Sequence, residues 1–162
     1  LLMGLVDALV ETHPIDPLRL MVGGASMGGY GAWDLATRYP ARFGVVIPIC
    51  GGGDPARAAK ALRCTRVWAF HAADDGTVPV AASRQMMQSL SAARALPLVP
   101  TALTLRDENA TVNDQLRYTE YASGGHAAAW QRPFAPSDQR VVEWAHRRLA
   151  QWPGDCVPPS GD

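Results

Sequence analysis

The chain has 162 residues, 48% of them apolar, so it is long enough and apolar enough to bury the core of one globular domain. Its 15 Lys and Arg residues balance 15 Asp and Glu residues, which argues against nucleic acid as a partner, because binding phosphates needs a basic surface. The longest apolar runs, such as Val45–Cys50, fall well short of the ~20 residues of a membrane-spanning helix, so we expect no membrane span.

The predicted elements alternate between helix and strand. They begin with an amphipathic helix, in which Leu2, Leu5, Val6, Leu9 and Val10 recur at helical spacing. Strands are predicted at Leu18–Gly23, Val45–Cys50, Arg66–His71 and Leu116–Tyr121. Further helices are predicted at Gly28–Arg38 and Ala56–Leu62, from Pro79 in a first turn through Ala93, and at Ser137–Gln151. This alternation predicts an α/β fold with about four parallel strands and helices on both faces of the sheet.

The chain reads as a single domain over residues 1–152, followed by a disordered tail at 153–162 that is rich in proline and glycine. The irregular stretch Ala95–Gln115 connects a predicted helix to the last strand, which places it at the amino ends of the strands. Ligands of open α/β sheets bind beyond the carboxyl ends. We therefore expect this stretch to lie away from any active site.

Three cysteines, Cys50, Cys64 and Cys156, cannot all pair within one chain. They are free thiols, or one disulfide and an odd thiol, and they do not define the cellular compartment. None stands in a Cys/His pattern of metal-ligand spacing. The sequence therefore implies neither a metal nor another cofactor.

A nucleophile motif lies between the first predicted strand and its helix. Gly24-Ala25-Ser26-Met27-Gly28 reads G-x-S-x-G, the pattern that turns a strand sharply into a helix and exposes the serine hydroxyl. The glycines are expected because side chains beside so tight a turn would collide. The backbone N–H of Met27 is placed to donate to an oxyanion formed beside Ser26. The alternative is a plain glycine-rich turn.

An acid and a base for this serine follow the later strands. Asp74 and Asp75 come after the third strand, and His126 comes after the fourth, which gives the order Ser, Asp, His found in α/β-hydrolases. Local chemistry does not separate the two aspartates, and the unused one is expected to be a solvated loop carboxylate.

Two other residues near these strand ends each have two possible roles. His71 either supports the acid loop by hydrogen bonding or is a structural histidine. Trp130 either lines the substrate pocket or packs in the core. His13 and His146 are expected at the surface.

Three segments together, GASMGGYGAWDLATRYPARFGVVIPICGGGDP, VWAFHAADDGTVPV and LRYTEYASGGHAAAW, resemble the α/β-hydrolase esterases grouped as phospholipase/carboxylesterase and polyhydroxybutyrate-depolymerase-like enzymes, which include feruloyl esterases. In that family the acid segment reads H-G-x-x-D-x-x-V-P, with a catalytic aspartate. The resemblance therefore assigns the acid to Asp75, and the Y-x-x-x-G-H ending assigns the base to His126.

The resemblance also implies earlier strands, and an oxyanion loop after one of them, that have no counterpart before Ser26. We therefore expect the chain to represent the C-terminal half of the α/β-hydrolase sheet, with an unpaired edge at Leu18–Gly23 that promotes association.

The predicted function is a serine carboxylester hydrolase without a cofactor, acting on a small-molecule or polymer-linked ester. The alternatives are a peptidase of the prolyl-oligopeptidase kind and a truncated, non-catalytic hydrolase module that binds a partner.

Overall fold

A four-stranded parallel sheet forms the centre of the computed structural model, which describes residues 1–96, 115–137 and 139–152. The strands are β1 (Met21–Ala25), β2 (Val45–Ile49), β3 (Arg66–Ala72) and β4 (Leu116–Tyr121), and they lie in this order across the sheet. All three pairings are parallel. The carboxyl ends of the four strands therefore share one edge, where ligands of such sheets bind.

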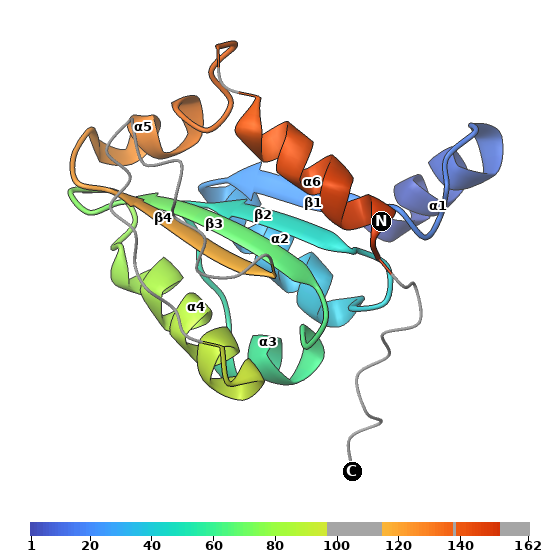
Figure 1. Cartoon of the computed structure of the whole chain (residues 1–162), viewed down its shortest axis with the longest axis horizontal. Coiled ribbons are helices and arrows are strands. Elements are labelled where there is room, and N and C mark those ends of the chain that lie inside the picture. The colour runs from blue at the N-terminus through green and yellow to red at the C-terminus, as the bar shows by residue number, and fades with distance from the viewer. Residues whose placement is uncertain (97–114, 138, 153–162) are drawn as a thin grey trace.

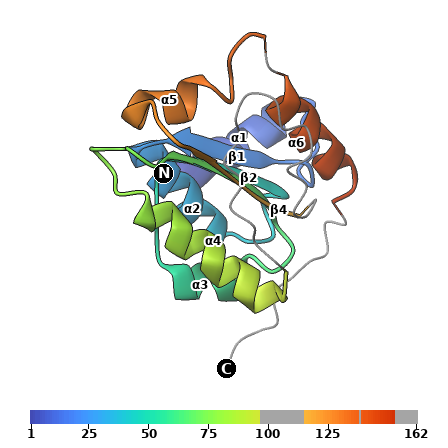
Figure 2. The same ribbon diagram turned by 60° about the vertical axis from the view of Figure 1, so that its left-hand side comes forward.

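Helices cover both faces of this sheet. They are α1 (Leu2–Thr12), α2 (Met27–Arg38), α3 (Pro55–Ala61), α4 (Ala81–Arg94), α5 (Gly125–Gln131) and α6 (Arg140–Ala150). Figure 1 shows α2, α3 and α4 on one face and α6 on the other, with α5 at the end of the sheet where the strands finish, and Figure 2 shows the same layers from a second direction. None of these helices in the described ranges is long and apolar enough to cross a membrane.

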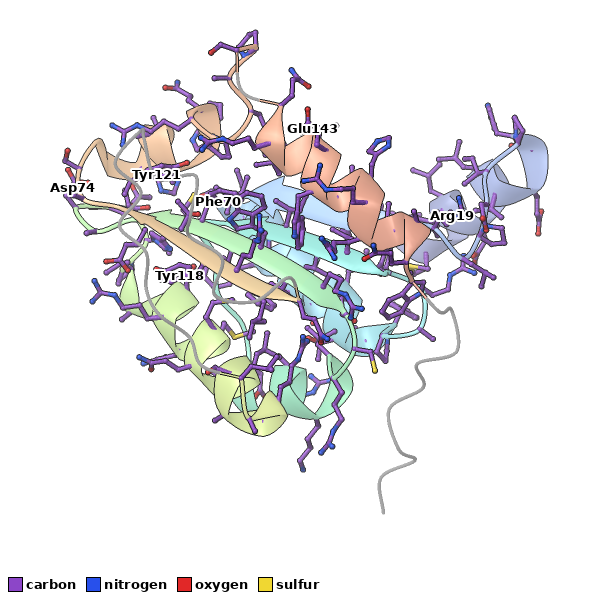
Figure 3. The ribbon with its side chains drawn as sticks, viewed as in Figure 1. Arg19, Phe70, Asp74, Tyr118, Tyr121 and Glu143 are labelled. Carbon is purple, nitrogen blue, oxygen red and sulfur yellow. The ribbon has the colours of Figure 1, made fainter. Side chains whose placement is uncertain are left out.

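Two apolar layers result from the alternation of side chains along each strand. Val46 packs with α2, α3 and α4, whereas its neighbours Val45 and Ile47 pack with α5 and α6. Figure 3 labels Phe70 and Tyr118, which belong to the layers on opposite faces. Because both faces are covered, β2 is buried along its whole length, as expected for a central parallel strand.

Three predicted elements start two or three residues too early, and one helix was missed. The last helix, α6, begins at Arg140 and not at Ser137. The first strand begins at Met21 and not at Leu18, because Leu18 lies in a turn in which its N–H donates to Asp16 Oδ1. Pro79 precedes α4, which begins at Ala81 after the cap residue Val80, and does not lie in its first turn. The short helix α5 was not predicted, because its seven residues begin with Gly125 and are too few for a helical repeat.

Within the described residues β1 pairs only with β2, so its other edge has no partner strand there. The side chains of Leu18 and Met21 near this edge are about half exposed, at 55% and 49%. Association through the edge stays a prediction. Most of the predicted connection, residues 97–114, and the predicted tail, residues 153–162, lie outside the described residues.

Candidate active site

Ser26 lies at the sharp turn between β1 and α2. Its backbone has φ 56° and ψ −118°, a combination outside the regions that non-glycine residues favour, and it caps the amino end of α2. Such a conformation costs on the order of 1–3 kcal/mol and persists only where the surroundings hold it. The Ser26 N–H donates to the Ile49 carbonyl at 2.9 Å, which ties the turn to the end of β2.

The glycines around Ser26 allow the backbone to cross itself closely. A Cβ on Gly24 would lie 2.4 Å from the Gly28 carbonyl oxygen, and one on Gly29 would lie 2.3 Å from that of Ile49. A Cβ on Gly28 would meet nothing within 4 Å. The expectation that both motif glycines avoid collisions is therefore wrong for Gly28. The second crowded glycine is Gly29, which the motif does not include.

We expect Gly29→Ala to destabilise the protein by several kcal/mol, because its Cβ would meet backbone of β2 that cannot move aside. Gly31→Ala, two residues further along α2, is the matched control. Gly31 is exposed and a Cβ there meets nothing within 4 Å, so alanine should raise stability by about 1 kcal/mol. Chemical denaturation of the two variants checks this. Equal stabilities would contradict the crowding described for the turn.

Asp75 and His126 form a hydrogen-bonded pair across the carboxyl ends of β3 and β4. His126 Nδ1 lies 2.7 Å from Asp75 Oδ2. The other oxygen, Oδ1, accepts the backbone N–H groups of Thr77 at 2.8 Å and Val78 at 2.9 Å. Burial by itself raises the pKa of the Asp75 carboxyl, but the hydrogen bonds from His126, Val78 and Thr77 outweigh it and lower this pKa. Asp75 is therefore an ionised, fixed acceptor for one nitrogen of His126.

The neighbouring Asp74 has different partners. Its carboxylate accepts the N–H of Gly125 at 2.8 Å and that of Gly124 at 3.0 Å, and these two hydrogen bonds, Gly125 first, lower its pKa. Both glycines have positive φ, at 64° and 120°, and they precede His126 directly. Figure 3 shows Asp74 at the outer end of the molecule. The carboxylate is exposed, and it also holds the turn that carries the histidine.

Cys50, which the sequence did not single out, lies beside Ser26 and the Asp75–His126 pair. Its Sγ, a carboxylate oxygen of Asp75 and a ring nitrogen of His126 lie within 4.8 Å of one another. Burial raises the pKa of this thiol, the backbone N–H of Ser26 opposes that rise, and Asp75 adds to it. Ser26 and the Asp75–His126 pair therefore both lie next to the buried side chain of Cys50.

Cys50 is a free thiol, whereas Cys64 is disulfide-bonded. Cys50, Asp75 and His126 are all metal-ligand types, but the 2.7 Å between Asp75 and His126 is a hydrogen-bond distance. Two ligands of a tetrahedral zinc with 2.0 Å bonds stand roughly 3.3 Å apart. The arrangement therefore fits a hydrogen-bonded pair better than a metal centre.

His71 is completely buried behind Asp75, at the end of β3. Its Nε2 lies 3.0 Å from the Val78 carbonyl and 3.3 Å from Asp75 Oδ2. Burial lowers the pKa of His71, the Val78 carbonyl and the charges of Asp75 and Glu120 oppose this, and His126 lowers it further. The histidine thus contacts the acid loop directly, as one of its two sequence readings required.

The lowered pKa of His71 predicts a loss of stability in acid. Below the ordinary histidine pKa of about 6.5, the unfolded chain takes up a proton that the folded chain resists, so folding weakens as the pH falls through this range. The midpoint of thermal unfolding should therefore fall between about pH 7.5 and about pH 5.5. His71→Gln should reduce the fall, whereas the control His146→Gln, at an exposed position, should leave it unchanged. Equal pH dependence in all three proteins would contradict the prediction.

The remaining predicted residues lie near the turn or at the surface. Met27 is the first residue of α2, so its N–H has no partner within the helix. Trp130, in α5, is 44% exposed. It borders a cavity of about 490 Å³, lined also by Met21, Gly23, Gly24, Ala25, Ile47, Ile49 and Phe134. His13 and His146 are exposed, as expected.

A protein family and a solved structure match this chain over most of its length. The family model described as "Putative esterase" matches residues 2–152. The chain belongs to the esterase family. The crystal structure of a thermostable esterase superimposes with a TM-score of 0.73 at 29% identity, covering 90% of this chain and 35% of that one. The chain therefore spans about a third of the length of that esterase.

Two more distant structures share the fold of this esterase-family chain. The acyl-protein thioesterase 2 of Zea mays gives a TM-score of 0.55 at 18% identity, covering 90% of this chain and 62% of that one. An acylaminoacyl peptidase of Pyrococcus horikoshii gives 0.57 at 14%, covering 93% and 25%. The sequence matches no curated protein. The parallel sheet with helices on both faces is that of the α/β-hydrolases, as the sequence predicted.

Proposed function

We propose that this chain carries the catalytic residues of a serine carboxylester hydrolase. The observation that supports this most strongly is the 2.7 Å hydrogen bond between Asp75 and His126, at the sheet edge where the strained turn holds Ser26. A serine hydroxyl is a weak nucleophile until a base takes its proton and an acid orients that base. Membership of the esterase family favours an ester as the substrate.

In the first half of the reaction, His126 Nε2 accepts the hydroxyl proton while Ser26 Oγ forms a bond to the carbonyl carbon of the ester. The negative charge that develops on the carbonyl oxygen is stabilised by the Met27 N–H at the positive end of α2. Asp75 keeps the proton of His126 on Nδ1 and stabilises the imidazolium. The alcohol then leaves with the proton from Nε2, and the acyl group stays on Ser26.

In the second half, His126 removes a proton from water, and the water oxygen bonds to the acyl carbon. The carbon–Oγ bond breaks, Ser26 regains its proton from His126, and the carboxylic acid leaves. Every step of this sequence is a proton transfer or an exchange of bonds at the acyl carbon, and no redox step enters it.

The cavity beside Ser26 suits an apolar group of the substrate. Ala25, the residue before the proposed nucleophile, lines it together with Ile47 and Ile49 from the sheet, Trp130 from α5 and Phe134 from the segment after α5. Aromatic and aliphatic walls of this kind bind hydrocarbon through area removed from water, about 25 cal/mol per Å². We therefore place the acyl chain or an apolar alcohol here.

Trp130→Ala should raise KM for esters with longer acyl chains about tenfold while changing kcat by less than about threefold, because it removes apolar contact area and no reacting group. Tyr39→Ala is the control, since Tyr39 is similarly exposed, at 41%, but caps the far end of α2. Steady-state kinetics with nitrophenyl esters of increasing acyl length measures both. A KM that is unchanged at every chain length would remove Trp130 from the substrate site.

The peptidase alternative uses the same triad chemistry, and the match to an acylaminoacyl peptidase supports a shared fold and no more. Comparing nitrophenyl esters with aminoacyl nitroanilides under the same conditions separates the two. The proposal predicts that ester turnover exceeds amide turnover by several orders of magnitude. Turnover of the anilide alone would favour the peptidase, and a folded protein that turns over neither would favour the non-catalytic binding module.

A further inference from the structure

We propose that His71 is a positioning residue, a buried imidazole that holds the Asp75 carboxylate in place for His126 and links it to the turn after β2. The catalytic consequence rests on the proposed function. The structural part, that His71 and its partner Ser83 fix Asp75, does not depend on it.

The contacts of His71 determine where its proton lies. The Val78 carbonyl, at 3.0 Å from Nε2, can only accept, and so can the ionised Asp75 Oδ2 at 3.3 Å. Nε2 therefore carries a hydrogen. This hydrogen faces the same carboxylate oxygen that accepts from His126 Nδ1 at 2.7 Å. Two imidazoles thus meet at one oxygen of Asp75, one of them catalytic in the proposed function and the other fully buried.

The second ring nitrogen is held by Ser83 of α4. His71 Nδ1 lies 2.8 Å from Ser83 Oγ, and Ser83 Oγ lies 2.8 Å from the Gly51 carbonyl. The hydroxyl has one proton, so it donates to Nδ1 when the ring is neutral and to Gly51 when the ring carries both protons. Both His71 and Ser83 are buried, at 0% and 1% exposure, so water does not compete for these positions.

Gly51 connects this network to the nucleophile turn. A Cβ on Gly51 would lie 2.6 Å from the carbonyl carbon of Gly29, so the backbone after β2 packs directly on the first turn of α2. The hydrogen bonds from Asp75 through His71 to Ser83 therefore run from the acid loop to α4, and Ser83 Oγ lies beside the Gly51 carbonyl at the end of β2. With a neutral ring the Ser83 proton is donated to His71, so the packing of Gly51 on Gly29 relates this network to the turn that carries Ser26.

Titratable groups from three neighbouring elements surround His71. Glu120 is the β4 partner of His71 in the sheet register, and Arg84 of α4 donates to Glu120, while His126 approaches from α5. Burial favours the neutral ring, which leaves the full negative charge of Asp75 available to His126. A neutral His71 can thus orient Asp75 without neutralising it.

The test compares His71→Leu with His71→Gln in the whole protein. Leucine fills similar space without a donor, whereas glutamine keeps an N–H near the position of Nε2 and cannot become charged. In proton NMR, we expect the Nδ1–H resonance of His126 to be protected in the wild type and in His71→Gln, and to be lost or broadened in His71→Leu. Carbon NMR should show that the Asp75 carboxyl titrates at higher pH in His71→Leu than in the wild type.

In hydrolysis assays, His71→Leu should lower kcat about 10- to 100-fold, the loss typical when a group that orients a site residue is removed, with KM changed less than about twofold. His71→Gln should restore most of it. Ser83→Ala should act in the same direction with smaller size, and Ser89→Ala, elsewhere on α4, should have no effect.

A folded His71→Leu protein with an unchanged His126 resonance and unchanged Asp75 titration would overturn the proposal. If His71→Leu does not fold, the Ser83→Ala variant is the test instead. Wild-type NMR and kinetic behaviour of Ser83→Ala would then overturn the proposal. If the wild type and the His71 variants show the expected NMR differences but the wild type hydrolyses no ester, the proposed function is refuted and the positioning role of His71 stands.

Discussion

Ser26→Ala should reduce ester hydrolysis by about 10³- to 10⁶-fold and abolish labelling by a fluorophosphonate. The proposed reaction proceeds through a bond to Ser26 Oγ, and alanine has no atom that can form it. The loss should appear in kcat, because the apolar cavity that binds substrate remains. Fold should be retained, since the structure shows the Ser26 backbone and not its hydroxyl bonded to Ile49.

Ser123→Ala is the matched control for this change. Ser123 is exposed and precedes the Gly124-Gly125 turn, so it lies near His126 in sequence without a place in the proposed chemistry. The Ser123→Ala variant should equal the wild type in its rate of ester hydrolysis and in its labelling by the fluorophosphonate. Labelling that persists in Ser26→Ala, or that disappears in Ser123→Ala, would show that a different serine reacts.

Asp75→Asn should lower kcat about 10⁴-fold with the protein still folded. The backbone N–H groups of Thr77 and Val78 require an acceptor at the position of Oδ1. The asparagine oxygen must take that position, so its NH₂ group faces His126 Nδ1. The imidazole then accepts at Nδ1 and carries its hydrogen on Nε2, where it cannot receive the proton of Ser26.

Asp74→Asn makes the same chemical change one residue earlier and serves as the control. One of the two hydrogen bonds from Gly125 and Gly124 loses its carboxylate acceptor, so stability should fall slightly and kcat by less than about tenfold. Measuring kcat and the denaturation midpoint of both variants separates catalysis from stability. A larger loss of kcat in Asp74→Asn would reverse the assignment of the acid.

The parts of the fold that sequence could predict were those with strong local patterns. The bounds predicted for the last strand, Leu116–Tyr121, agree with β4, because alternating large residues lie between polar turns. The predicted start of the first strand was three residues too early, because Leu18 is apolar but lies in a turn that is hydrogen-bonded by Asp16. Apolar character alone does not reveal that contact. The helix α5 has seven residues, with Gly124 as its cap and Gly125 as its first residue, both with positive φ, so no helical repeat was long enough to indicate it.

Some residues of the candidate site could likewise be predicted from local patterns, and others could not. Ser26 could be found from its motif, and the strand order could bring Asp75 and His126 to one edge, but their 2.7 Å contact is a feature of the tertiary structure that no local pattern reveals. Nothing in the sequence indicated Cys50 or Ser83. Each reaches the site from an element distant in sequence, through packing of β2 and α4, which is a property of the tertiary structure alone.

The most direct measurement of the central claim is to map the fluorophosphonate adduct. The protein would be labelled at neutral pH, digested and analysed by tandem mass spectrometry, with Asp75→Asn labelled in parallel. The account predicts one adduct, on Ser26, and much slower labelling of Asp75→Asn. An adduct on any other residue, or no adduct on a folded protein, would contradict it.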